Sequence, residues 1–284
     1  MEKTTGMGKD ILHQLMTETH YRSPNRSPGW TAECFPGLYF YWKIAGVVLR
    51  ASKYARRNQY SDERWIADSL QILKILENTG VRVSIDHMDR LRRLKSACVF
   101  IANHMSTLET FVLPCLIQPH RKSTFVVKQS LVEYPVFKHV MINLQPIVVT
   151  RENPREDLKT VLEQGIRRLR EGISIIVFPQ TTRHVDIHLS HFNTIGIKLA
   201  ARAGVPALPV AVRTDAWGNG KWIKEFGRIH PEKPVHFSFG EPISVTGHGK
   251  QQHQTVVNYI KSRLSEWFAE SPAASSEPPK ASAL

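Results

Sequence analysis

The chain has 284 residues, of which 42% are hydrophobic, so it is long enough to bury a substantial core in one large domain. Its three cysteines, Cys34, Cys98 and Cys115, form no CxxC pair and are too few for a disulfide framework, which favours a reducing compartment. The formal net charge of +13 indicates an anionic partner, for which nucleic acid and an anionic membrane surface are the main candidates.

Residues 1–34 are polar, and Ser23-Pro24 and Ser27-Pro28 are turn signals. We expect this segment to form a loosely packed arm. Its first residues lack the apolar core of a signal peptide, and no apolar run approaches the ~18 residues that a membrane-spanning helix requires. The sequence therefore predicts no spanning helix.

Residues 35–80 predict two consecutive amphipathic helices. The first carries tryptophan and tyrosine, and it places four basic residues close to one stripe: Lys43, Arg50, Lys53 and Arg57. The second runs from about residue 62 to residue 78 and ends before Gly80. Such a hairpin is typical of the membrane interface, and the alternative is a hairpin packed on the protein's own core.

From Val81 onward, short apolar strands alternate with helices, which predicts an α/β fold with a mostly parallel sheet flanked by helices. The candidate strands are Val81–Ile85, Cys98–Ala102, Thr124–Val127, Ile147–Val149, Ser174–Phe178, Ala207–Val212 and Val235–Phe239. The candidate helices are Ser106–Ile117, Pro135–Met141, Pro154–Arg170, His191–Ala203 and Gln252–Phe268. We assign this domain to residues 81–269, and the low-complexity residues 270–284 to a disordered tail.

The segment from Asn103 to Glu109 follows a buried strand and contains a histidine five residues before a carboxylate. Five helical residues rotate a side chain by about 140° relative to the first, so His104 and Glu109 converge only if His104 lies in the turn before the helix. A base and its orienting carboxylate need that arrangement. Ser106 is a candidate helix N-cap, and Ser106-x-x-Glu109 is also a capping box, which requires no catalysis.

Three further short blocks contain a predicted strand next to polar residues or prolines. Gln145–Arg151 and Phe178–Arg183 each deliver an arginine to the end of a strand, and Val205–Val210 is a strand bracketed by prolines. In this order the four blocks resemble the NHxSxxD, GxxFxxR, FPEGTR and VPxxPV patterns of the PlsC-type glycerolipid acyltransferases, a resemblance that covers roughly residues 81–243.

The resemblance implies a role for each matching residue. His104 would take the proton from an acceptor hydroxyl, and Glu109 would hold the imidazole. A basic group would bind the acceptor's phosphate, because guanidinium donors match phosphate geometry. That group consists of Arg151, Arg183 and Lys128. Supporting positions in the turns are Asn103, Ser106, Gln180 and Thr181.

This sequence departs from the family pattern at three of these positions. Glu109 replaces an aspartate and is one methylene longer, Gln180 replaces a glutamate, and Thr181 replaces a glycine. These changes leave the acceptor open: lysophosphatidic acid is the first choice, and glycerol 3-phosphate, another lysophospholipid or a lyso-aminolipid are the alternatives. They also leave open a basic lipid-binding protein with a degenerate site.

The function implied by the resemblance is acyl transfer from acyl-CoA or acyl carrier protein to the free hydroxyl of a lysophospholipid. It implies no cofactor and no metal, and a peripheral position on the cytoplasmic face of a membrane with an anionic surface. A nucleic-acid partner ranks last, because the chain carries no helix-turn-helix, zinc-finger or RNA-binding signature.

A competing metal site is suggested by four residues next to the third block: His184, Asp186, His188 and His191. Their spacing matches no strong zinc pattern, so we expect no metal there. Cys98 and Cys115 lie in apolar runs and are interpreted as core residues. Trp217 follows a strand and is a candidate for lining the acyl path.

Overall fold

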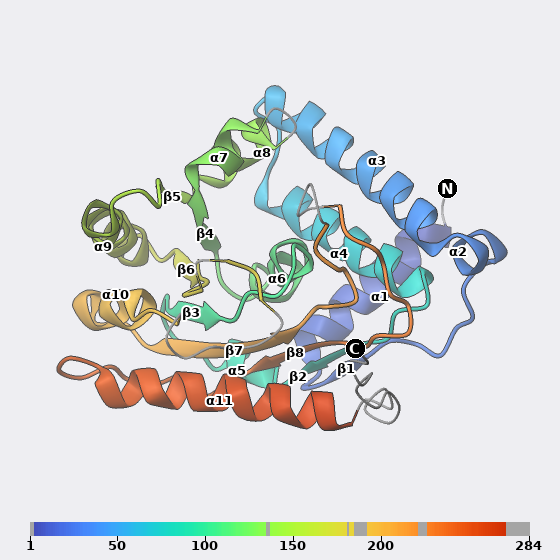
Figure 1. Cartoon of the computed structure of the whole chain (residues 1–284). Coiled ribbons are helices and arrows are strands. Elements are labelled where there is room, and N and C mark those ends of the chain that lie inside the picture. Colours follow the sequence, from blue (N-terminus) through green and yellow to red (C-terminus); the bar gives the residue numbers. More distant parts are fainter. Residues whose placement is uncertain (1–2, 135–136, 181, 185–191, 221–225, 271–284) are drawn as a thin grey trace, which may run out of the picture.

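The computed structural model describes residues 3–134, 137–180, 182–184, 192–220 and 226–270. Eight strands form one sheet with helices on both faces (Figure 1). The strands are β1 (Tyr21–Arg22), β2 (Val83–Asp86), β3 (Val99–Ala102), β4 (Ser123–Lys128), β5 (Ile147–Val149), β6 (Ser174–Val177), β7 (Ala207–Arg213) and β8 (Val235–Phe239). The predicted α/β fold is confirmed.

The helices precede, connect and follow these strands. They are α1 (Lys3–Thr17), α2 (Trp30–Cys34), α3 (Pro36–Arg56), α4 (Asp62–Asn78), α5 (Asp89–Arg92), α6 (Leu108–Ile117), α7 (Gln129–Glu133), α8 (Lys138–Leu144), α9 (Pro154–Arg170), α10 (Ile195–Ala203) and α11 (Lys250–Ala269). Helix α9 begins at Pro154, which is favourable because the first helical residue needs no backbone N–H. The Asn153 side chain caps the helix by accepting backbone N–H groups of its first turn. None of the described helices is both long and apolar enough to cross a membrane.

The strand order is β1-β2-β8-β7-β3-β6-β4-β5. The block from β7 to β5 is parallel throughout, whereas β8 runs antiparallel to β7 and parallel to β2. In the parallel block the carboxyl ends of all strands therefore meet at one edge of the sheet. Loops at such an edge are the usual place for a ligand in an α/β protein.

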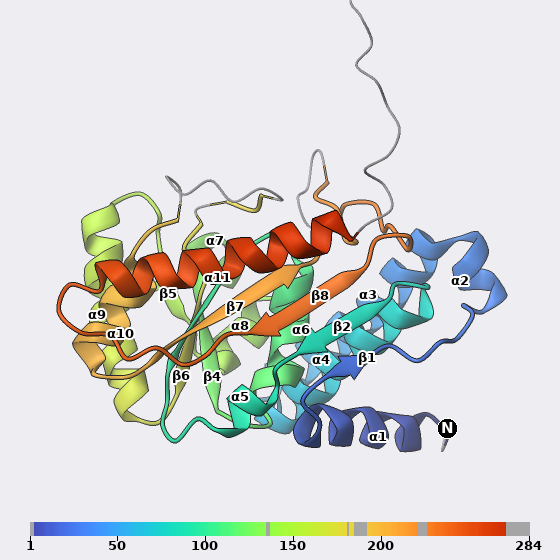
Figure 2. The same ribbon diagram turned by 90° about the horizontal axis from the view of Figure 1, so that it is seen from below.

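Side chains of the central strand β3 alternate between two hydrophobic clusters. Phe100 packs with α1, α4 and α6, whereas Val99 and Ile101 pack with α9, α10 and α11. Figure 2 shows α11 lying across β7 and β8 on one face, with α4 and α6 on the other. Because both faces are covered, the strand is apolar at every position.

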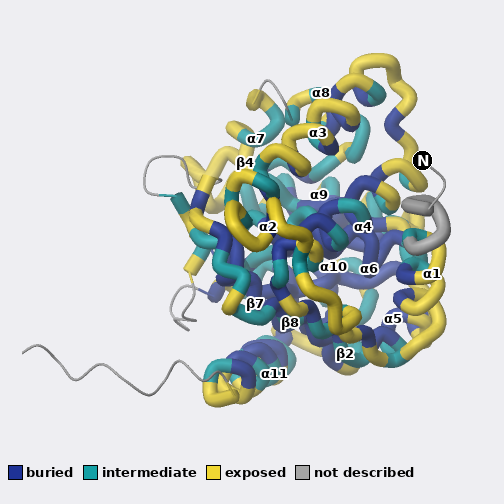
Figure 3. The backbone as a smooth tube through the Cα atoms, turned by 90° about the vertical axis from the view of Figure 1, so that its right-hand side faces the viewer, coloured by how far each residue is buried: buried dark blue, intermediate teal, exposed yellow. Residues whose placement is uncertain are grey.

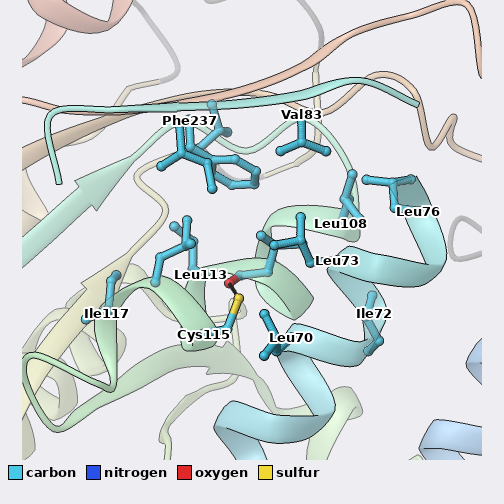
Figure 4. Packing of buried hydrophobic residues seen from close by; sticks show 14 of the residues in the cluster. Leu70, Ile72, Leu73, Leu76, Val83, Leu108, Leu113, Cys115, Ile117 and Phe237 are labelled. Carbon is cyan, nitrogen blue, oxygen red and sulfur yellow. Dashed lines mark hydrogen bonds between the residues drawn. The ribbon is translucent and has the colours of Figure 1, made fainter. Parts of the chain in front are cut away.

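The predicted helical hairpin, residues 35–80, divides into an inner and an outer helix. Leucines of α4 point towards α6 in Figure 4, and Leu73 and Leu76 are fully buried. Helix α3 packs on α4 but keeps Leu38, Trp42 and Leu49 between 63% and 72% exposed. Figure 3 places buried residues around α6 and the strands and exposed ones along the outer helices. Helix α4 is therefore part of the core.

The N-terminal arm differs from our expectation of loose packing. Leu15 of α1 is 1% exposed and Ile11 is 6% exposed, and both join the core beside α4 and α6. Strand β1 pairs with β2 in antiparallel register, Tyr21 opposite Ile85. The sequence did not predict this strand, because two residues give no periodicity. Side chains add to this pairing: the Tyr21 hydroxyl donates to Glu77 of α4 at 2.7 Å, and the Arg22 guanidinium bonds Asp86 of β2 at 2.6 Å.

Every candidate strand is present, and helix ends account for most of the differences. Strands β5 and β8 and helices α4 and α9 begin and end as predicted. Helix α6 begins at Leu108 rather than Ser106, because residues 103–107 form a turn at the sheet edge. Helix α10 begins at Ile195 and α8 runs to Leu144, later than predicted in both cases. The predicted tail, apart from Glu270, lies outside the described residues.

The inner position of α4 generates a stability prediction. Leu73→Ala should lower the free energy of unfolding by about 2–5 kcal/mol, because a fully buried leucine leaves a cavity. Leu38→Ala, at a side chain that is 72% exposed, should change it by less than about 0.5 kcal/mol. Urea unfolding followed by circular dichroism measures both. Equal, small effects of the two changes would place α4 outside the core.

Candidate active site

The predicted site residues lie along the carboxyl edge of the parallel block. His104 follows β3, Gln180 and Arg183 follow β6, Lys128 ends β4, and Arg151 follows β5. Blocks that are far apart in the chain thus meet at one edge of the sheet. Adjacent strands lie ~4.8 Å apart, so β3 and β5 are separated by roughly 14 Å, with β6 and β4 between them.

His104 and Glu109 are in direct contact. His104 lies in the turn after β3 and Glu109 in the first turn of α6, and the His104 Nδ1 atom is 2.7 Å from the Glu109 Oε1 atom. The ring is packed face to face on Phe178, with 4.4 Å between ring centroids. This bond assigns the hydrogen of the neutral imidazole to Nδ1, which leaves the lone pair on Nε2. The His104 side chain is 12% exposed, so the ring is largely shielded but reachable.

The Glu109 carboxylate is fully buried and is surrounded by hydrogen-bond donors. Oε1 accepts the backbone N–H of Met105 at 2.7 Å and of Ser106 at 3.0 Å. Oε2 accepts the hydroxyl of Ser106 at 3.1 Å and the hydroxyl of Thr214 at 2.6 Å. Each oxygen thus receives donors that replace its lost water.

These contacts decide the ionisation of Glu109. Burial alone would raise its pKa, but the hydrogen bond and charge of His104, together with the bonds from Thr214 and the backbone, hold the pKa below its usual value. Glu109 is therefore an anion at neutral pH. An anion bonded to Nδ1 stabilises the imidazolium that forms when Nε2 takes a proton.

The Ser106 hydroxyl bonds both the Glu109 carboxylate and the first residue of α6. Helix α6 has Thr107 at its N-cap position, without a side-chain cap bond, whereas the Ser106 hydroxyl accepts the N–H of Leu108 at 3.0 Å. The Ser106 N–H and hydroxyl both reach Glu109. The segment therefore combines the geometry of a capping box with the histidine–carboxylate pair, and the two sequence interpretations describe the same turn.

The turn that carries His104 is also held by amide side chains. Asn103 donates to the carbonyl of Val212 and accepts its N–H, both at 2.8 Å, which ties β3 to β7 where they end. The Gln180 side-chain oxygen accepts the N–H of His104 at 2.6 Å and is 3% exposed. Gln180 thus positions the backbone of the histidine. Thr181 lies outside the described residues.

The two arginines are close enough to affect each other. Partial burial and the positive charge of Arg183 both lower the pKa of the Arg151 guanidinium, and the nearby Asp157 opposes them. Guanidinium donors match the geometry of a phosphate, so two neighbouring arginines are suited to bind one. Lys128 is exposed, and the β4–β5 register sets it beside Val149, two residues before Arg151.

The backbone of Arg151 is in the left-handed region, with φ +65°, which is unfavourable for a residue with a side chain. Asp157, in the first turn of α9, compensates by accepting the N–H of Thr150 at 2.9 Å and the N–H of Arg151 at 2.8 Å. This helix start therefore fixes the turn that presents the second block's arginine.

Sequence reasoning missed three contributors to the site: Thr214, Asn219 and Phe178 as the ring partner of His104. Thr214 is the first residue after β7 and Asn219 donates to the carbonyl of Met105 at 3.0 Å. A hydroxyl directly after a buried strand that ends at the same sheet edge was the available signal for Thr214. Asn219 lies further along the loop and gave no signal.

The remaining candidates from the sequence are the two buried cysteines, Trp217 and the competing metal cluster. Burial raises the pKa of the Cys98 and Cys115 thiols to about 12, so neither thiol is a nucleophile at neutral pH. Trp217 is 3% exposed and stacks on Phe111, with 5.8 Å between ring centroids. Of the competing metal cluster, only His184 is described, and the described residues hold no group of three metal-ligating side chains.

Comparisons with known proteins point to one family. Residues 82–213 match the protein family Acyltransferase. A 1-acyl-sn-glycerol-3-phosphate acyltransferase from Pseudomonas aeruginosa is 25% identical over 236 residues, which cover 82% of this chain and 85% of that protein. A protein with the same description from Haemophilus influenzae is 28% identical over 62% of this chain and 70% of its own length.

The fold has a solved counterpart. The crystal structure of the 1-acyl-sn-glycerophosphate acyltransferase PlsC from Thermotoga maritima superposes with a TM-score of 0.59. It is 22% identical and covers 84% of this chain and 97% of that one.

Proposed function

We propose that the chain is a PlsC-type acyltransferase that moves a fatty acyl group from a thioester donor to the free hydroxyl of 1-acylglycerol 3-phosphate, giving phosphatidic acid. The observation that carries the proposal is the His104–Glu109 pair, at 2.7 Å, on the same sheet edge as Arg151 and Arg183. The relatives' descriptions name the acceptor, and acyl-CoA and acyl carrier protein are both retained as donors.

The reaction needs one base and no protein nucleophile. The Nε2 atom of His104 takes the proton from the acceptor hydroxyl while that oxygen attacks the thioester carbonyl. The tetrahedral intermediate then collapses, the carbon–sulfur bond breaks, and the departing thiolate receives the proton from the imidazolium. Glu109 stabilises the imidazolium between the two steps, and no cofactor enters the proposed scheme.

In this proposal the basic group selects the acceptor by binding its phosphate. In 1-acylglycerol 3-phosphate the phosphate is on one terminal carbon of the glycerol, the acyl chain is on the other, and the free hydroxyl is on the central carbon. With the phosphate on Arg151 and Arg183, the hydroxyl reaches back along the sheet edge towards His104. Holding the phosphate and the reacting hydroxyl together replaces an unlikely encounter by an oriented one.

Removal of the base tests the reaction. His104→Ala should lower the kcat of transfer from labelled palmitoyl-CoA to lysophosphatidic acid in vesicles by about 10²–10⁴-fold, because general-base catalysis is lost. The exposed His248, in the loop before α11, provides the matched control, and His248→Ala should retain wild-type activity.

The acceptor and donor are varied in the same assay. Transfer only to glycerol 3-phosphate or to another lysolipid would keep the chemistry and replace the acceptor. Silence of the unaltered protein with every acceptor, with both CoA and carrier-protein donors, would reject the proposed reaction in favour of lipid binding alone.

The phosphate role predicts a selective effect on the acceptor. Arg151→Ala should raise the KM for lysophosphatidic acid by about tenfold or more, since a charge-assisted bond is lost, and should leave the KM for palmitoyl-CoA within about twofold. Arg151→Lys, which keeps the charge but not the paired donors, should fall between. The exposed Arg170, at the end of α9, supplies the control variant Arg170→Ala. An equal rise in both KM values would contradict a specific phosphate contact.

We further propose that α3 docks the protein on an anionic membrane surface at the cytoplasmic face. Exposed apolar residues extend from α2 along α3: Trp30, Phe35, Leu38, Trp42 and Leu49. Lys43 lies over the Trp42 ring at 4.8 Å, and Lys53 is exposed further along the helix. Arg50, by contrast, bonds Asp68 of α4 at 2.5 Å and therefore holds the two helices together. An apolar row beside cations suits a headgroup layer.

Vesicle binding tests this surface. Trp42→Ala should weaken sedimentation with phosphatidylglycerol vesicles by about tenfold, because the ring's apolar area is lost from the interface. Binding should also fall at high salt and be weaker with phosphatidylcholine. Met16→Ala, at a partly exposed residue of α1, is the control. Unchanged binding of the Trp42 variant would direct the search for the docking surface elsewhere.

A further inference from the structure

The loop after β7 reaches the histidine–carboxylate pair from the side opposite to the basic group. Strand β7 neighbours β3 on one side, and β6 neighbours it on the other. Thr214 is the first residue after β7, is fully buried, and donates its hydroxyl to the Oε2 atom of Glu109 at 2.6 Å. This contact spans 105 residues of sequence, so it exists only in the folded chain.

The two carboxylate oxygens of Glu109 have different hydrogen-bond partners. Oε1 faces His104 and the backbone of the turn, whereas Oε2 receives side-chain hydroxyls from Ser106 and Thr214. The terminal torsion of a glutamate is broad and roughly two-fold, so the carboxylate rotates easily unless both oxygens are held. A fixed Oε2 therefore keeps Oε1 on the imidazole.

Resting on the proposed acyl transfer, we propose that Thr214 is a positioning residue, which orients the carboxylate of Glu109 and through it the imidazole of His104. The longer glutamate needs this second anchor, because its extra methylene adds a rotatable bond. Asn219, five residues along the same loop, holds the other side of the turn through the carbonyl of Met105. The loop after β7 thus clamps the catalytic turn.

The loop is itself anchored away from the site. The N–H of Trp217 donates to the carbonyl of Thr214 at 3.1 Å, which closes a turn directly after the strand. The indole N–H of Trp217 donates to the Tyr41 hydroxyl of α3 at 3.0 Å, and the ring packs on Phe40 with 4.9 Å between centroids. The position of Thr214 is consequently supported by the contacts of Trp217 in addition to its own bond with Glu109.

Removal of one hydroxyl tests the proposal. Thr214→Val keeps the shape and should lower kcat by about tenfold to a hundredfold, with both KM values within about twofold. Thr214→Ser restores the donor and should return kcat to within about threefold of the unaltered protein. The control is Thr124→Val in β4, which removes a buried hydroxyl bonded to the carbonyl of Leu144 at 2.9 Å and should leave kcat unchanged.

The pH dependence separates positioning from a merely structural role. Since the Thr214 bond favours the ionised carboxylate, its loss should raise the pKa of Glu109. The part of the acidic limb of the kcat/KM profile that reflects protonation of Glu109 should therefore move to higher pH in Thr214→Val and return in Thr214→Ser. Loss of stability alone would lower the amount of active enzyme without moving this limb.

A readout without turnover completes the test. The carboxyl carbon of Glu109, titrated by nuclear magnetic resonance, should show the upward pKa change in Thr214→Val and not in Thr124→Val. An unchanged titration would overturn the role of Thr214, whether or not the protein transfers acyl groups. An active unaltered protein with a fully active Thr214→Val variant would overturn it equally and leave the proposed function intact.

Discussion

A fully buried carboxylate is stable only where hydrogen bonds replace the water that it has lost. Glu109 is fully buried, so the segments around it must supply these hydrogen-bond donors. Its donors come from the turn after β3 and from Thr214, the first residue after β7. Those segments are brought together only when β3 and β7 pair in register, Ala102 beside Val210. The charge that assists His104 therefore depends on the packing of the parallel block.

The same edge separates two kinds of chemistry. On the β7 side of β3, polar side chains satisfy one another, and the Asn103 amide bridges the strand ends. On the β6–β5 side the arginines repel each other and a strained backbone turn is held by Asp157. The first half is an internal hydrogen-bond network, whereas the second brings two positive charges close together. This asymmetry suits a reaction in which an anionic acceptor is placed against a prepared base.

The N-terminal helices connect this chemistry to the proposed membrane surface. Helix α4 is core, because its leucines pack on α6, whose first turn carries Glu109 (Figure 4). Helix α3 turns its apolar row outward, yet its Tyr41 contacts the loop after β7 through Trp217 and through the carbonyl of Gly227. Tyr41 thus connects the outer helix α3 to the loop that bonds the turn carrying His104.

The sequence by itself determined the alternation of strands and helices and the order of the four blocks, because hydrophobic periodicity and short motifs are local properties. It also restricted His104 and Glu109 to a turn and a helix start, since five residues on one helix cannot share a face. Tertiary structure alone decided that α4 is buried, that Tyr21 begins an edge strand, and that Thr214 reaches Glu109. These contacts join residues distant in the chain, and only pairing and packing of the strands brings such residues together.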